Sequence, residues 1–267
     1  MVAVVIPIYR EKPLPLEIVS LARCCQVLSK YDIIFVCPDK LDVSWYREFC
    51  KEKGTISVES FDPGYFTGIE GYNRLLVSAK FYERFLKYDF ILIHQLDAYV
   101  FDDTLEHWCA LSLDYIGAPW IDISWHEEYR GRVKVDIFKK QSFLLRQLTK
   151  IKWKLKNLDS RDSLRVGNGG LSLRKVKTFF DIASVAEKPE PLYNEDVFWS
   201  MYVALTHDDF RIADVKTAVS FCFDSKPAVC LSLNAGKLPF ATHGWYRNAG
   251  EYDGNFDFWK SYIDVNS

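Results

Sequence analysis

The chain has 267 residues, of which 49% are hydrophobic and 26% charged. This composition excludes a disordered chain and supports a sizeable core, while the lack of any run of about eighteen apolar residues excludes a membrane-spanning helix. Seven scattered cysteines without a CxxC pair predict reduced thiols rather than a disulfide framework or a zinc site. The opening residues MVAVVIPIYR predict a strand and not a signal peptide, so we expect a cytoplasmic protein.

The first half of the chain alternates apolar runs with segments of helical spacing. Strands are predicted at Val2–Ile8, Asp32–Cys37, Thr55–Glu59 and 88–94, and helices at Leu14–Ser29, Ser44–Lys53 and 69–87. This alternation predicts a mainly parallel sheet covered by helices. Neither GxGxxG nor GxxxxGK[ST] follows the first strand, which argues against a Rossmann dehydrogenase and a P-loop protein.

The second half is more irregular. Asp114–Trp120 predicts a strand and a turn, and Val166–Leu173 predicts a glycine-bearing turn that leads into a strand. Helices are predicted at Lys175–Val185 and Glu195–Leu205, and short strands around 210–223.

Polar residues follow the ends of several predicted strands. Tyr9 and Arg10 follow the first, Asp39 the second, and Asp97 the fourth. In open α/β sheets ligands bind at the carboxyl ends of the strands, so these groups are expected to meet. Asp97 could bind a cation that neutralises a diphosphate, or it could simply cap a turn.

Three other segments have both a functional and a structural interpretation. Glu195 and Asp196 could include a general base, or could interact with a helix dipole. The glycines of VGNGGLSLR could bring backbone close to a ligand, or form a bulged turn. His243 in ATHGWYR could be a metal ligand or a structural histidine.

Taken together, VAVVIPIYRE, GYNRLLVSAKFYERFLKYDFILIHQLDAYVF, GNGGLSLR, NEDVFW and ATHGW form an ordered series. This series resembles a bacterial glycosyltransferase-like domain family of unknown function, which is distantly similar to the β-1,4-galactosyltransferases. The resemblance covers nearly the whole chain except about 122–163. It implies a GT-A-like fold, a mixed and mainly parallel sheet flanked by helices, and transfer of a hexose from a nucleotide-sugar donor, with UDP favoured.

The resemblance also implies roles for individual residues. Asp196, with Glu195 second, matches the catalytic acidic pair of an inverting transferase, and Asp97 and His243 match metal ligands for Mn²⁺ or Mg²⁺. Residues matched to the nucleotide and donor site, together with Asp39 at its strand end, are Pro7, Ile8, Tyr9, Arg10, Asp39, Asn73, Arg74, Gln95, Asp97, Asn168, Gly169 and Gly170. We add Trp120, Trp245 and Arg247 as acceptor-side residues. Gln95 stands where the β-1,4-galactosyltransferases have the first Asp of their DxD motif, which removes a charge from the metal site and leaves metal dependence open.

The net charge of −2 is unevenly distributed. Residues 130–165 contain twelve Lys or Arg and three Asp, a net charge of +9, so the remainder carries −11. Within this segment 135–158 predicts one basic amphipathic helix, with Ile137, Leu144, Leu148, Ile151, Leu155 and Leu158 on one side. Such a helix suits an anionic membrane surface, on the inner face of the cell membrane, or it packs on the domain with a solvated basic face. No nucleic-acid recognition motif accompanies the charge.

We therefore expect one domain over 1–267, with a nucleotide-binding half (1–120), a basic insertion (122–163) and an acceptor and catalytic half (164–267). The expected acceptor is a glycan or a lipid-linked hydroxyl in surface polysaccharide synthesis. A catalytically inactive nucleotide- or glycan-binding module, or a peripheral membrane scaffold, is the alternative.

Overall fold

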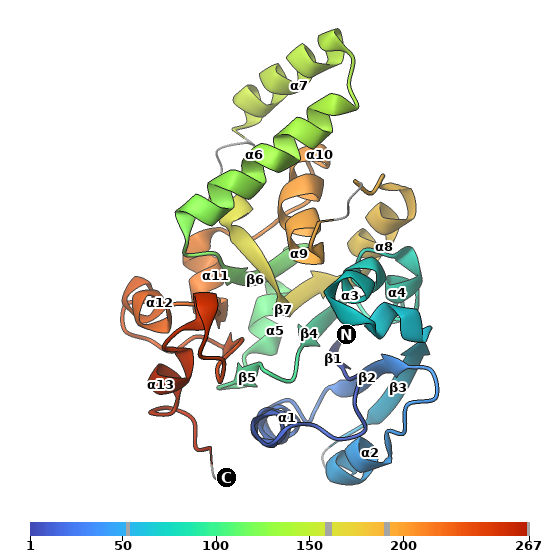
Figure 1. Cartoon of the computed structure of the whole chain (residues 1–267), viewed down its shortest axis with the longest axis vertical. Helices are drawn as coiled ribbons and strands as arrows, with labels where there is room; N and C mark the ends of the chain where they lie inside the picture. The colour runs from blue at the N-terminus through green and yellow to red at the C-terminus, as the bar shows by residue number, and fades with distance from the viewer. Residues whose placement is uncertain (52–53, 158–161, 190–192, 266–267) are drawn as a thin grey trace.

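A computed structural model describes residues 1–51, 54–157, 162–189 and 193–265 (Figure 1). Its central element is a six-stranded sheet in the order β3-β2-β1-β4-β7-β6. The strands of this sheet are β1 (Val2–Pro7), β2 (Asp32–Pro38), β3 (Ile56–Phe61), β4 (Phe90–His94), β6 (Tyr115–Pro119) and β7 (Val166–Lys175). A second sheet, in the order β5-β9-β8, contains β5 (Tyr99–Val100), β8 (Cys222–Phe223) and β9 (Ala241–Thr242).

The predicted parallel arrangement of the first half is confirmed. β1 pairs in parallel with both β2 and β4, and β2 pairs in parallel with β3. β7 runs antiparallel to β4 and β6 and makes the sheet a mixed one. The strands are long apolar runs because both faces of the sheet are covered, and Ile91, Leu92 and Ile93 are fully buried.

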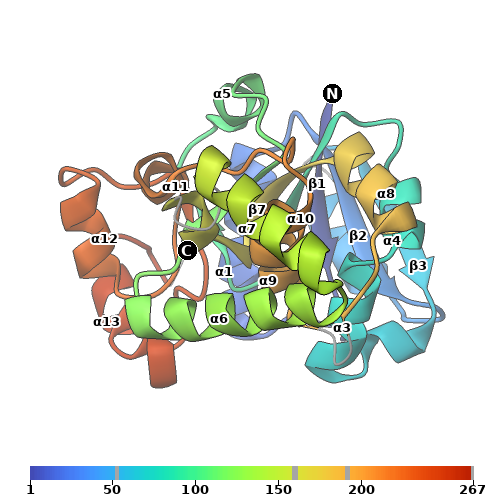
Figure 2. The ribbon, with the colours of Figure 1, turned by 90° about the horizontal axis from the view of Figure 1, so that it is seen from above.

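Helices surround this sheet (Figures 1 and 2). In the first half they are α1 (Pro15–Val27), α2 (Ser44–Cys50), η1 (Pro63–Phe66), α3 (Gly68–Leu76), α4 (Ala79–Glu83) and α5 (Leu105–Ala110). The middle of the chain contributes α6 (Ile123–Lys139), α7 (Phe143–Lys156), η2 (Asp162–Arg165), α8 (Val176–Val185), α9 (Glu195–Val197), the π-helix η3 (Phe198–Val203) and α10 (Ala204–Thr206). The last helices are α11 (Val215–Phe221), α12 (Pro227–Leu233), η4 (Gly250–Tyr252) and α13 (Asn255–Trp259).

Several predicted elements differ from those observed. The helix predicted at 69–87 is two helices, because Ser78 starts a new one by accepting a hydrogen bond from the backbone of Phe81. The turn predicted at 166–170 is part of β7, whose register against β6 shifts at a bulge. Strands predicted around 210–223 are mostly α11, which Asp214 caps at the backbone of Thr217.

The prediction of a single basic helix at 135–158 is also wrong. The segment contains the end of α6, a turn, and α7, because Ser142 caps α7 at the backbone of Leu145. Leu158 lies outside the described residues. The two helices form a hairpin that lies at one end of the long axis of the molecule (Figure 1).

Candidate active site

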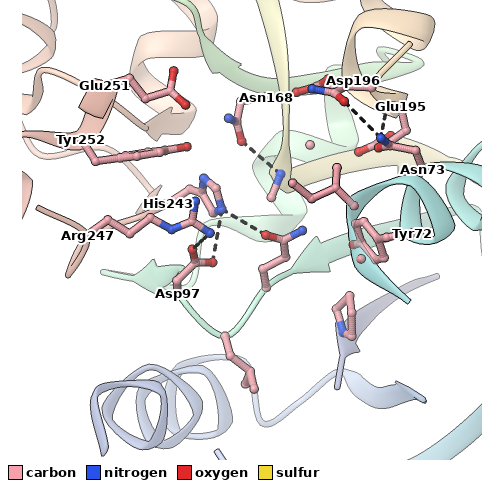
Figure 3. A pocket seen from close by; sticks show the side chains of 18 of the residues that line it. Tyr72, Asn73, Asp97, Asn168, Glu195, Asp196, His243, Arg247, Glu251 and Tyr252 are labelled. Atoms are coloured by element: carbon pink, nitrogen blue, oxygen red, sulfur yellow. Dashed lines mark hydrogen bonds and ion pairs between the residues drawn. The ribbon is translucent and has the colours of Figure 1, made fainter. Parts of the chain in front are cut away.

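A cleft of about 610 Å³ opens beside the carboxyl ends of β1 and β4. Most of the predicted site residues line it, although they come from distant parts of the sequence (Figure 3). The predicted residues that line the cleft are Pro7, Tyr9, Asn73, Gln95, Asp97, Trp120, Asn168, Gly169, Gly170, Glu195, Asp196, His243 and Arg247. The sheet topology therefore brings the ordered series of motifs to one place.

The other predicted residues lie outside this lining. Ile8 is 1% exposed and belongs to the core, while Asp39 and Arg74 are exposed at the surface and Arg74 pairs with Glu70. Arg10 is held by Glu17, with Nη2 2.5 Å from Oε1.

The prediction that Trp245 offers a face to an acceptor sugar is wrong. Its side chain is fully buried in a small hydrophobic cluster, and its Nε1 donates a hydrogen bond of 2.8 Å to the hydroxyl of Ser20. A ring enclosed on all sides has no face left for a ligand. Trp120, by contrast, lines the cleft.

Asp97 lies in the turn after β4 and is 5% exposed. Its Oδ1 is 3.2 Å from His243 Nε2, and its Oδ2 is 2.5 Å from Arg247 Nη2. Burial alone would raise the pKa of Asp97, but the charges of His243 and Arg247 outweigh it and hold this pKa well below its usual range. The carboxylate therefore stays ionised in the cleft.

His243 is held between two carboxylates. Its Nδ1 lies 2.7 Å from Asp224 Oδ1, and its Nε2 faces both Asp97 and Gln95 Oε1, the latter at 3.2 Å. Burial would lower the pKa of His243, but the charge of Asp97 and the hydrogen bond with Asp224 raise it to about 10. With this raised pKa, a protonated His243 and the guanidinium of Arg247 both pair with Asp97.

The atoms around His243 Nε2 also fit a divalent cation. Asp97 Oδ1, Gln95 Oε1 and His243 Nε2 converge, and a histidine whose Nδ1 donates to a carboxylate presents Nε2 as a ligand. A bound cation would replace the proton on Nε2. Among the described residues no three His, Cys, Asp or Glu side chains gather to hold a metal ion, so the amide of Gln95 is needed as the third protein donor.

Two glycines of β7, Gly169 and Gly170, leave space that neighbouring side chains occupy. A Cβ at Gly169 would lie 1.9 Å from Glu195 Oε1, and a Cβ at Gly170 would lie 2.0 Å from His243 Nε2. No other residue type leaves room for these two side chains at the strand. The GNGG segment thus determines how closely the acidic segment and the histidine approach each other.

The acidic segment starts α9 at the far side of the cleft. Glu195 is 4% exposed, and its Oε1 accepts a hydrogen bond of 2.9 Å from Arg174 Nη2. Its other oxygen, Oε2, is buried without a hydrogen-bond partner among the described residues. Asn73 holds this segment, since its Oδ1 accepts from the backbone of Glu195 and its Nδ2 donates to Asn194.

Asp196 also lines the cleft. Burial, and then the neighbouring charge of Glu195, raise the pKa of Asp196 to about 7. A carboxyl with a pKa near neutrality can take a proton and release it again, as a general base must. Asp196 lies across the cleft from Asp97 (Figure 3).

Several residues of the site were not predicted from the sequence. Further lining residues are Glu17, Tyr72, Tyr129, Tyr246, Glu251 and Tyr252. Arg174 belongs to the VGNGGLSLR segment but had no predicted role, and Asp224, the first residue after β8, was not predicted as a site residue. Both act on the site through a charged partner and not by lining the cleft.

We expect Arg174→Met to lower the free energy of unfolding by about 3–5 kcal/mol, because it leaves the buried charge of Glu195 without its partner. The double variant Arg174→Met/Glu195→Gln should recover more than half of this loss, since no charge then remains buried. Urea unfolding measures both. Lys177→Met, which breaks the exposed pair with Asp181, is the control and should cost about 0.5 kcal/mol or less. Equal losses in the single and double variants would contradict the prediction.

Comparisons with known proteins agree with this fold. A family model described as "Protein of unknown function (DUF5672)" matches residues 55–243, and no curated protein matches the chain. The apo structure of the bifunctional glycosyltransferase WbbM is 18% identical with a TM-score of 0.53, over 99% of this chain and 50% of that one. The chain thus spans half the length of WbbM.

Two further glycosyltransferase structures share the fold. The galactosyltransferase LgtC, in complex with donor and acceptor sugar analogues, is 13% identical with a TM-score of 0.54, over 97% of this chain and 94% of that one. GlyE of Streptococcus pneumoniae TIGR4 is 15% identical with a TM-score of 0.51, over 98% of this chain and 60% of that one. The predicted glycosyltransferase-like GT-A fold is confirmed. At these identities the likeness concerns the fold alone.

Proposed function

Since the chain belongs to the family described as "Protein of unknown function (DUF5672)", we infer its function from its fold and its cleft. We propose that it transfers a hexose from a nucleotide sugar, with UDP favoured, to a hydroxyl of a glycan or lipid-linked acceptor in surface polysaccharide synthesis. One observation carries the proposal: in a glycosyltransferase-like fold, the ion-paired cluster of Asp97, His243 and Arg247 lies across the cleft from a carboxyl with a raised pKa, Asp196.

The diphosphate of the donor binds beside Asp97 in this proposal. Arg247 supplies a guanidinium there, which suits phosphate oxygens. Asp97, Gln95 and His243 would hold a divalent cation, and such a cation would supply positive charge to neutralise the diphosphate. Tyr9 and Pro7, at the end of β1, lie where the nucleoside would extend along the cleft.

The reacting sugar occupies the space between these groups and the acidic segment. Asn168 and the glycines of β7 border it, and Glu195 lines the cleft beside them. Asp196 takes the proton of the acceptor hydroxyl as its oxygen attacks the anomeric carbon. Attack from the side opposite the diphosphate inverts the configuration, and Trp120 provides an apolar wall for the acceptor.

A second candidate function follows from Gln95. Because an amide replaces a carboxylate among the cation donors, the site carries one negative charge fewer than a DxD site. A module that binds a nucleotide or a glycan without transferring a sugar would need the groups around Asp97 but not the base, Asp196.

A thermal-shift panel of UDP, GDP, CMP and dTDP sugars, each with and without Mn²⁺, tests the proposal. A ligand that binds the folded state raises the melting temperature by mass action, and we expect a UDP-sugar with Mn²⁺ to give the largest shift. Slow hydrolysis of that donor should accompany the shift. A shift without hydrolysis would favour the binding module, and no shift with any donor would overturn the proposal.

The anomer of a transfer product tests the stereochemistry separately. Inversion agrees with Asp196 as the base. A product that retains the configuration of the donor would show that Asp196 is not the base. It would not contradict the proposal that the protein is a transferase.

A further inference from the structure

The hairpin of α6 and α7 carries an exposed apolar stripe that the proposed transfer reaction does not use. The stripe lies on α7, and its members are Leu144, Leu148, Ile151 and Leu155, with exposed fractions of 69%, 53%, 55% and 81%. Their spacing of four, three and four residues places them on one side of the helix. Phe143, at the start of α7, is 77% exposed.

The opposite side of α7 is fixed to the protein. Trp153 is 3% exposed, its ring packs on Phe138 of α6 at 5.1 Å between centroids, and its Nε1 donates to the carbonyl of Leu205 at 3.0 Å. Lys152 and Lys156 reach Asp208, with Nζ–Oδ1 and Nζ–Oδ2 distances of 2.9 and 2.5 Å. These contacts determine which side of α7 faces outward, so the apolar stripe is presented by a fixed helix.

The charge of α7 indicates which kind of surface binds the apolar stripe. Its fourteen residues contain Arg146, Lys150, Lys152, Lys154 and Lys156 and no Asp or Glu, a net charge of +5. On a helical projection Lys150 and Lys154 lie along one border of the stripe, and Lys152 and Lys156 along the other. Asp208, which pairs with Lys152 and Lys156, lowers this charge to +4, and a second copy would bring +4 against +4, which opposes self-association through this face.

We propose that α7 docks on an anionic lipid surface, with the stripe of Leu144, Leu148, Ile151 and Leu155 among the acyl chains and Lys150 and Lys154 at the headgroups. An apolar face bordered by Lys and Arg on both sides is the pattern of a helix that lies in the membrane interface. Lysines beside the stripe add an electrostatic attraction to anionic lipids, and salt weakens this attraction. In the described part of the chain, no helix has both the length and the apolar character to cross a bilayer.

The position of the hairpin relates the docking surface to the cleft. Tyr129 of α6 lines the cleft, while α7 lies at the far end of the molecule in Figure 1. One hairpin thus connects the lipid surface to the wall of the site. The docking proposal does not rest on transfer activity, because its contacts and charges are separate from the acidic segment and the Asp97 cluster.

Flotation of the full-length protein with vesicles tests the proposal. We expect it to bind vesicles of equal parts phosphatidylglycerol and phosphatidylcholine, and to bind vesicles of phosphatidylcholine alone at least about tenfold more weakly. Leu148→Ser/Ile151→Ser removes the centre of the stripe, and Lys150→Gln/Lys154→Gln removes one charged border. Each double variant should weaken binding by about tenfold or more, and added salt should weaken the wild type.

Matched controls are available on other surfaces. Val185, which is 79% exposed on α8, gives the apolar control Val185→Ser, and Lys216 of α11 gives the charge control Lys216→Gln. Both should bind vesicles as the wild type does. All substituted positions are exposed, and circular dichroism checks that each variant is folded. Wild-type binding by Leu148→Ser/Ile151→Ser, or no binding by the wild type, would overturn the proposal, as would a wild-type dimer in sedimentation that this variant abolishes.

Discussion

Asp196→Asn should reduce the rate of sugar transfer by about 1,000-fold, because an amide cannot take the proton of the attacking hydroxyl and general bases contribute about 100- to 10,000-fold. The substitution preserves the size of the side chain, and its contact with the backbone N–H of Val197 can be kept through the amide oxygen. The donor dissociation constant should therefore change little. Initial rates and donor binding by calorimetry measure the two effects, with the nucleotide sugar that gives the largest thermal shift as donor.

The pH profile adds an independent readout for the same residue. The pKa of Asp196 is raised to about 7 by burial and by Glu195, so the carboxylate is lost as the pH falls below 7. The wild-type rate should fall about tenfold for each pH unit below 7, and the residual rate of Asp196→Asn should lack this limb. Asp181→Asn, at an exposed carboxylate of α8, should keep the wild-type profile. Wild-type transfer by Asp196→Asn, with unchanged donor binding, would show that Asp196 is not the base.

The raised pKa of Asp196 also makes the free energy of unfolding depend on pH, in a direction that can be stated. A carboxyl whose pKa is higher in the folded state binds its proton more tightly there, so its contribution to stability is lost as the pH rises from about 4 to about 7. One pKa unit corresponds to about 1.4 kcal/mol, which limits this loss to about 4 kcal/mol. Asp196→Asn removes the titrating group. It should therefore be more stable than the wild type above pH 7, which also excludes unfolding as the cause of lost activity.

The parallel half of the fold could be predicted because its strands are buried on both faces. Runs such as 91–93 contain only apolar residues, and prolines and glycines separate them from helices of clear periodicity. Element ends were less predictable. The break before α4 and the break before α7 each depend on one serine that caps a helix, Ser78 and Ser142, within segments whose periodicity continues across the break.

Site residues were predictable where a local motif held both the chemistry and its position. Asp97 ends a strand, and Gly170 belongs to a run of glycines. Trp245 shows why an aromatic residue beside a motif is a weak signal: burial depends on the neighbours that the fold supplies, and here these include Ser20, 225 positions earlier in the sequence.

Arg174 and Asp224 are site residues that could not be predicted from the sequence. Each acts by a charge contact with one partner, at 2.9 Å from Glu195 and at 2.7 Å from His243 respectively. The sequence separations of 21 and 19 residues correspond to no local spacing rule. Such partners become visible only when the strand register and the loop after β9 are known.

Asp97→Asn should weaken Mn²⁺ binding by about 100-fold or more and reduce transfer accordingly, since loss of a partner that merely orients a ligand already costs about 10- to 100-fold. The substitution removes the charged donor and leaves Gln95 and His243 as the remaining protein donors. Gln95→Asp makes the opposite change. It adds a carboxylate next to the donor set, on a side chain one methylene shorter than that of Gln95, whose Oε1 lies 3.2 Å from His243 Nε2, and it should tighten Mn²⁺ binding by about tenfold or more. Calorimetry with Mn²⁺ alone measures both variants before any donor is added.

Asp97→Asn and the wild type, each assayed with and without a chelator, decide between the cation and Arg247 as the main counter-charge for the diphosphate. Arg247 Nη2 is 2.5 Å from Asp97 Oδ2, so Asp97→Asn also frees this guanidinium to contact phosphate oxygens. If the cation carries the reaction, a chelator stops the wild type and Asp97→Asn is nearly inactive with or without it. If Arg247 carries it, the wild type transfers in chelator and Asp97→Asn keeps or gains activity. Asp181→Asn, at an exposed carboxylate of α8, should match the wild type in every measurement, because no charge in the cleft changes.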